Sequence, residues 1–244
     1  AYHDIQHVLD VTLAMARLID GYERSKIGAQ RFGDTLFRLG VITALFHDMG
    51  YVRELADHEH KNGAEFTLTH VSRGSVFLKD YLPKIGMPEM ADIAAELIHF
   101  TGYETPVGNI KVPSPIYRLL GSMLGSADII AQMSDRCYLE KCRDRLYPEF
   151  VAGGLATKRT TEGKEQVVFA SGEDLVLKTP QFFKGASKRL DLELGGCYSY
   201  AQQHFGGQNL YLEEVNKNIQ FAQGIAQESD QSILKRIPPE TLKS

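Results

Sequence analysis

The chain has 244 residues, of which 43% are hydrophobic and 24% are charged, and its formal net charge at pH 7 is −4. These values are typical of a globular protein with one large domain or one domain and an appendage. The acidic balance leaves no basic surface for nucleic acid or an anionic membrane, and no apolar run is long enough to cross a bilayer.

The first half of the sequence predicts a series of amphipathic helices, because apolar residues recur there at three- and four-residue spacing. Asp34 is expected to cap the second helix, which runs to His47 and Asp48. Pro83 and Gly86 are expected to end the third. Helices are predicted over residues 4–21, 34–48, 70–86, 87–100 and from 116 to 130 or beyond, with loops at 53–66 and 101–115.

The pattern of apolar residues changes near residue 150. Two β-rich runs, 165–169 and 175–179, flank a Ser-Gly-Glu-Asp turn and predict a β-hairpin, and helices are expected after it. We therefore predict two domains: a helical one over residues 1–149, and a helical extension with a hairpin over 150–244 that packs on the first.

Three cysteines are present without a CxxC pair, which favours reduced, packed thiols and a cytoplasmic location. No basic segment followed by an apolar one opens the chain, so we expect no signal peptide. The chain opens without Met and close to a motif of interest, so we expect a fragment of a longer protein, with an upstream sensor domain as one candidate.

His47 and Asp48 raise the main question of the sequence, because they stand at the inner end of the apolar run FRLGVITALF. Burying two ionisable groups is costly unless a partner compensates them, and a metal ion is one such partner. Other candidate ligands lie in or beside apolar helices. These are His7, His70, His99 and Asp128, with His3 one helical turn before His7.

Each candidate also has a structural interpretation that needs no metal. A lone histidine on an apolar helix is commonly a hydrogen-bonded core residue, Asp128 could satisfy a buried backbone group, and His47-Asp48 could cap a helix C-terminus. Together these readings require several independent coincidences, whereas one shared cation accounts for all the placements. Histidine and carboxylate ligands suit several divalent metals equally.

The sequence resembles a known family at these residues. His7, His47-Asp48 and Asp128 match in order the H…HD…D pattern of the HD-domain metal-dependent phosphohydrolases, over residues 2 to about 150. The opening YHDIQHVLDV also resembles the YHNxxHxxDV signature of class I cyclic-nucleotide phosphodiesterases, with Asp4 in place of Asn.

This resemblance implies an all-α fold, an HD-domain helical bundle, in which His7, His47, Asp48 and Asp128 hold one metal ion. Asp48 would bridge to a second ion, for which His70 and His99 lie at the expected positions. One or two divalent ions are thus expected, and the sequence does not distinguish Zn, Mn, Mg, Fe and Ni. Tyr51 and Phe100 differ from the Lys and His of the HD-GYP group, which argues against a cyclic dinucleotide substrate.

The predicted function is a phosphodiesterase that acts on a nucleotide or cyclic nucleotide. A metal held with open positions lowers the pKa of bound water and supplies hydroxide for attack on phosphorus. Asp48, through the metal, and His3, as the general acid for the leaving oxygen, are the predicted catalytic residues. Lys61, Arg73 and Arg118 lie near the ligands in sequence, but none is singled out as a phosphate contact.

Two alternatives remain open at this point: a metal-binding sensory module without turnover, and an HD-type di-iron oxygenase with the same ligand set. The expected partner is a small phosphate ester, with no nucleic acid and no membrane, and a homodimer is compatible with the sequence. The loop at 101–115 and the predicted hairpin are expected to form the rim of the pocket.

Overall fold

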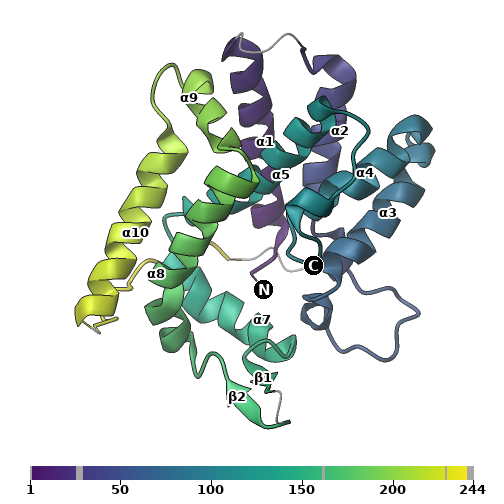
Figure 1. The fold of residues 1–244 in the computed structure, drawn as a ribbon. Coiled ribbons are helices and arrows are strands. Elements are labelled where there is room, and N and C mark those ends of the chain that lie inside the picture. Colours follow the sequence, from purple (N-terminus) through teal and green to yellow (C-terminus); the bar gives the residue numbers. More distant parts are fainter. Residues whose placement is uncertain (1, 26–29, 161–162, 229, 241–244) are drawn as a thin grey trace.

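The structure is a computed structural model that describes residues 2–25, 30–160, 163–228 and 230–240. The described residues are mostly helical with one small antiparallel hairpin, which confirms the predicted all-α class with a small hairpin (Figure 1). The α-helices are α1 Ile5–Ser25, α2 Gly33–Leu45, α3 His70–Lys84, α4 Ala91–Leu97, α5 Pro115–Met133, α6 Tyr138–Lys141, α7 Tyr147–Ala152, α8 Gly172–Lys188, α9 Ala201–His204 and α10 Leu210–Glu228.

Short helical segments connect these elements. The 3-10 segments are η1 Met49–Tyr51, η2 Gly63–Phe66, η3 Pro88–Met90, η4 Ile98–Phe100, η5 Val107–Asn109 and η8 Cys197–Tyr200. Two segments are π-helical, η6 Cys142–Leu146 and η7 Arg189–Glu193.

Helix α2 differs from the prediction at both ends. It begins at Gly33, and no side chain caps it; Asp34 lies inside the first turn, where a negative charge still favours the helix dipole. It ends at Leu45, so His47 and Asp48 lie in the turn that leads to η1 rather than within the helix. The turn allows two consecutive side chains to face the same point, which consecutive positions of a helix cannot do.

The hairpin lies earlier in the chain than predicted. β1 (Thr157–Arg159) pairs antiparallel with β2 (Glu165–Val167). The predicted second run, 175–179, belongs instead to α8. Ser171 caps this helix by accepting a hydrogen bond from the backbone N–H of Asp174, and the apolar residues that follow are buried at helical spacing, so the segment prefers a helix.

Helices α1 and α5 form the centre of the molecule, with α2 beside them and the α3–α4 pair on one side (Figure 1). α8, α9 and α10 lie on the opposite side, and α9 packs against α1. A Cβ atom on Gly21 of α1 would lie 1.9 Å from the carbonyl oxygen of Tyr200, the last residue of η8. The backbones of α1 and η8 are therefore in direct contact at this point.

One hydrophobic cluster contains residues from both sides of position 150. Leu18 and Leu120 belong to the same cluster as Leu175, Leu194 and Ile225. The three cysteines are free and buried, as predicted for packing residues. Within the described ranges, no helix has the length and apolar character to cross a membrane.

Candidate metal centre

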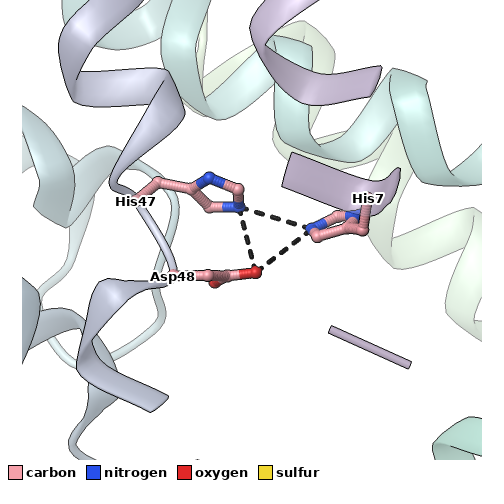
Figure 2. A group of neighbouring side chains, drawn as sticks. All are labelled: His7, His47 and Asp48. Carbon is pink, nitrogen blue, oxygen red and sulfur yellow. Dashed lines mark hydrogen bonds and ion pairs between the residues drawn. The ribbon is translucent and has the colours of Figure 1, made fainter. Parts of the chain in front are cut away.

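Three donor atoms from two separate segments meet beneath the start of α1. The Nε2 atoms of His7 and His47 lie 3.3 Å apart, and each lies 3.3 Å from Oδ2 of Asp48 (Figure 2). His7 belongs to the first turns of α1, whereas His47 and Asp48 follow α2. The three residues form a group that can hold a metal ion.

Asp128 of α5 lies against the same group. Its Oδ1 is 3.5 Å from Nε2 of His7 and 3.9 Å from Nε2 of His47. The structure therefore brings together the four residues that the H…HD…D pattern singled out, from three different helical regions.

The spacing of these atoms fits a shared cation. Ligand atoms about 2.1 Å from one metal ion are about 3.0 to 3.4 Å apart in octahedral or tetrahedral geometry. Oδ2 of Asp48 is buried and has no hydrogen-bond donor among the described residues. Nδ1 of His47 lies 2.7 Å from the Ala44 carbonyl oxygen; donating its proton there leaves the lone pair of Nε2 directed at the group.

The electrostatics of the group also favour positive charge. Burial would lower the pKa of His47, but the charge of Asp48 outweighs it and raises the pKa to about 9. Burial opposes ionisation of Asp48 as well, yet the neighbouring His47 holds the pKa of that carboxyl well below its usual range. A cation at this point would replace the proton that these carboxylates attract to the histidines.

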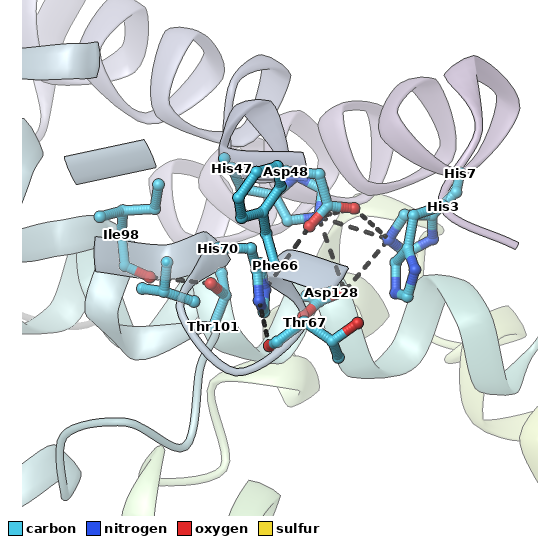
Figure 3. A network of polar contacts seen from close by, with 12 residues as sticks. His3, His7, His47, Asp48, Phe66, Thr67, His70, Ile98, Thr101 and Asp128 are labelled. Atoms are coloured by element: carbon cyan, nitrogen blue, oxygen red, sulfur yellow. Dashed lines mark hydrogen bonds and ion pairs between the residues drawn. The ribbon is translucent and has the colours of Figure 1, made fainter. Parts of the chain in front are cut away.

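His70 lies beside the group and His99 does not. Nε2 of His70 is 3.9 Å from Oδ1 of Asp48, and its Nδ1 contacts the Thr67 carbonyl oxygen at 2.8 Å (Figure 3). Burial lowers the pKa of His70, which keeps it neutral and able to bind a metal. His99 makes no hydrogen bond or ion pair with these donors in the described part of the chain, and its Nδ1 is buried without a partner.

The different outcome for the two histidines follows from their elements. His70 is the first residue of α3, at the helix end that packs against η1 and Asp48. His99 lies in η4, between Ile98 and Phe100, which are fully buried in the core. His99 therefore lies in a segment held by core packing, and it does not line the cavity on which the donor group opens.

His3 is held at the edge of the same site by Glu149. Its Nδ1 lies 2.7 Å from Oε2 of Glu149, while the backbone N–H groups of Tyr2 and His3 donate to Oε1. Burial alone would lower the pKa of His3, but the hydrogen bond to Glu149 and the charge of Asp48 raise it above its usual value. This shift favours the protonated form of His3, which is the form that a general acid needs.

Tyr51 separates His3 from His70 by stacking on both rings. Its ring centroid lies 4.5 Å from that of His3 and 4.3 Å from that of His70, with interplanar angles of 18° in each case. Sequence comparison identified Tyr51 only as a departure from the HD-GYP pattern. In the structure it sets the distance between two histidines of the site.

Glu149 was missed by the sequence analysis. It lies 146 residues from His3 in sequence, so no local spacing pattern could connect the two residues. Asp4, which stands where the phosphodiesterase signature has Asn, accepts a hydrogen bond from the backbone N–H of His7 and thereby caps α1. Asp and Asn side chains can both cap a helix N-terminus, so Asp4 in place of Asn still positions His7 in the first turn of α1.

A cavity of about 440 Å³ opens on the donor group. His3, His7, Asp48, His70 and Asp128 line one end of it. The predicted rim is correct in part. Residues 101–104 of the loop line the cavity, and so do Leu175, Lys178 and Thr179 from the second predicted β-run, which belong to α8. The first predicted run, 165–169, does not line it.

The three basic residues that lie near the ligands in sequence do not line this cavity. Arg73 donates to the carbonyl oxygens of Gly50 and Val52, and Arg118 donates to those of Val107 and Ile110. Both are structural contacts between loops and helices. Lys61 is exposed and does not line the cavity either.

Comparison of the chain with protein-family models, with curated proteins and with solved structures found no match.

Proposed function

We propose that this chain is a metal-dependent phosphohydrolase, a phosphodiesterase that acts on a small phosphodiester; the nucleotide or cyclic nucleotide expected from the sequence stays a prediction. The observation that supports this most is the convergence of His7, His47, Asp48 and Asp128 around one point. Among the described residues, the buried Oδ2 of Asp48 has no hydrogen-bond donor, and the group faces a cavity large enough for a small ester.

In this proposal the four residues hold a divalent cation, which when bound supplies hydroxide at neutral pH and offsets negative charge on phosphate oxygens. His3 lines the same cavity and donates a proton to the leaving oxygen. Glu149 keeps His3 protonated and oriented until that step. Tyr51 holds His3 away from His70 and so preserves its orientation.

The second ion implied by the family resemblance has partial support. Asp48 turns Oδ2 towards His7 and His47 and Oδ1 towards His70, as a bridging carboxylate would. His99, the other predicted ligand of that ion, makes no hydrogen bond or ion pair with Asp48 or His70 among the described residues. We therefore propose one four-residue site, with His70 and Asp48 as the nucleus of a weaker second one.

A di-iron oxygenase is the second candidate, because the far walls of the cavity are largely apolar and such a lining also suits an uncharged substrate. Iron-dependent activity that is lost without oxygen would identify it. Hydrolysis that continues without oxygen, with manganese or zinc, would instead favour the phosphohydrolase.

The test of the proposed function is hydrolysis of bis-p-nitrophenyl phosphate by protein supplied with manganese, in parallel with Asp48→Ala. We expect turnover by the native chain and a loss of at least about a thousandfold in Asp48→Ala, because the variant removes a ligand and the bridging oxygens together. Asp80→Ala, at an exposed position of α3 outside the cavity, is the matched control.

Two results would contradict this proposal. A folded Asp48→Ala that still binds metal and hydrolyses the ester would remove the assigned role of Asp48. Absence of turnover by the native chain at every metal dose would favour the sensory module instead.

A further inference from the structure

The cavity beyond the donor group has two walls of apolar side chains. One wall is formed by Leu175 and Phe182 of α8, and the other by Leu146, Phe150 and Leu155. Leu146 belongs to the π-helical segment η6, and Phe150 to α7. The same cavity thus joins a strongly polar end, at the candidate metal centre, to an apolar chamber between α8 and the α7 region.

Lys178 is the only lysine or arginine that lines this cavity among the described residues, and it is already paired. Its Nζ lies 2.6 Å from the Val168 carbonyl oxygen and 2.8 Å from Oδ2 of Asp174. Arg189 is buried and does not line the cavity; it donates to the carbonyl oxygens of Phe100 and Gly102. Within the described ranges, therefore, no unpaired lysine or arginine side chain faces a substrate in the chamber.

The acidic groups of the cavity leave little positive charge to offset a polyanion. Asp48 and Asp128, which line the cavity, would balance the charge of one divalent ion, and His3 is paired with Glu149, which lies outside the cavity lining. Glu104 accepts hydrogen bonds from the backbone N–H groups of Val71 and Ser72 at the start of α3. A buried charge without a partner is costly, so a doubly or multiply charged phosphate is disfavoured here.

We propose that the apolar chamber is a subsite for the retained organic group of a singly charged phosphodiester, and that this group is aromatic or alkyl rather than a polar nucleoside. This inference rests on the proposed function, since it assigns the phosphate to the metal end of the cavity. The chamber supplies apolar surface, which stabilises an apolar substituent in proportion to the area removed from water.

Polar side chains also line the cavity, but two of them are already engaged within the protein. Thr179 donates to the Val176 carbonyl oxygen, and Gln132 accepts from the hydroxyl of Tyr2 and donates to the Asp128 carbonyl oxygen. Pairing them with the hydroxyl groups and base edge of a nucleoside would require breaking these hydrogen bonds.

The test compares esters that share a p-nitrophenolate leaving group. Bis-p-nitrophenyl phosphate and methyl p-nitrophenyl phosphate are both singly charged diesters and differ only in the retained group. p-Nitrophenyl phosphate is doubly charged at pH 8. Cyclic AMP is added as a singly charged diester with a polar organic group, and its turnover is measured by product chromatography.

We expect kcat/KM to be about tenfold higher for the bis-aryl ester than for the methyl ester, and lower again for the doubly charged ester and for cyclic AMP. Phe182→Ala should lower kcat/KM for the bis-aryl ester about tenfold and change it less than twofold for the methyl ester. Phe182→Leu, which keeps an apolar side chain, should retain most of the difference.

Phe37→Ala is the matched control, because Phe37 is 41% exposed on α2 outside the cavity and Phe182 is 40% exposed on α8. It should leave all rates unchanged, and circular dichroism checks that each variant is folded. Three results would overturn the subsite but leave the proposed phosphohydrolase in place. They are equal kcat/KM for the two diesters, equal effects of Phe182→Ala on both, and faster turnover of cyclic AMP or p-nitrophenyl phosphate than of the bis-aryl ester. Hydrolysis of none of these esters with any metal would overturn both.

Discussion

Glu149 and His3 show how a residue's chemical role depends on a partner far away in the chain. His3 is useful as a general acid only while it is protonated. Burial would lower the pKa of His3, but two neighbours raise it: Oε2 of Glu149 accepts a hydrogen bond from Nδ1 of His3, with 2.7 Å between the two atoms, and Asp48 adds negative charge. The pKa of Glu149 is correspondingly lowered: burial would raise it, but the hydrogen bond to His3 outweighs burial.

Glu149→Gln should move the alkaline limb of the pH–rate profile to lower pH. The acid is active below the pKa of His3 and loses its proton above it, so a lower pKa ends activity at lower pH. We expect at least about a tenfold loss of kcat at pH 8 and a smaller loss at pH 6. Both proteins carry the same metal, so its charge affects both profiles alike.

Glu213→Gln, at an exposed position of α10, is the control for this substitution and should leave the profile in place. An alkaline limb that does not move in Glu149→Gln would show that His3 is not the group that titrates in it.

At the level of elements, the turn between α2 and α3 determines the geometry of the site. It carries Asp48 and Tyr51 on either side of Gly50, which lies against the first residue of α3. A Cβ atom on Gly50 would lie 1.8 Å from the His70 carbonyl oxygen, so only glycine allows this approach. Any displacement of the turn would separate Asp48, Tyr51 and His70.

Gly50→Ala should therefore destabilise the fold by about 2 to 4 kcal/mol and weaken metal binding at the same time. Thermal unfolding and calorimetric metal titration measure the two effects. Gly185→Ala is the control, because Gly185 lies in α8 with no atom within 4 Å of an added Cβ. It should raise stability by about 0.5 to 1 kcal/mol, the helix preference of Ala over Gly. Unchanged metal affinity in Gly50→Ala would contradict the role of the turn.

The sequence predicted the helices and the four converging ligands because both depend on local patterns. His7 lies on a helical stripe, and His47-Asp48 interrupts an apolar run, so each is visible within a few residues. Glu149 could not be found in this way, since its contact with His3 is made only by the fold. The run at 175–179 was misassigned because β-rich residues outweighed the Ser171 cap signal.

At the scale of the whole molecule, the candidate site depends on both halves of the chain. The donor groups come from α1, the turn after α2, and α5, whereas Glu149 and the apolar chamber come from residues 146 to 182. One hydrophobic cluster extends across these parts. A cation at the donor group would link three helical regions and stabilise the native state by preferential binding.

The most direct test of the account is the metal content of the purified protein, measured by elemental analysis after dialysis against metal-free buffer. The native chain should retain about one equivalent of a divalent transition metal, or up to two if the site at His70 is filled. Asp48→Ala and His47→Ala should each retain less than about a tenth of that amount, with Asp80→Ala unchanged. Two results would contradict the central claim that these four residues share one cation. The native chain could keep no metal after incubation with zinc, manganese or iron, or the two ligand variants could keep as much metal as the native chain.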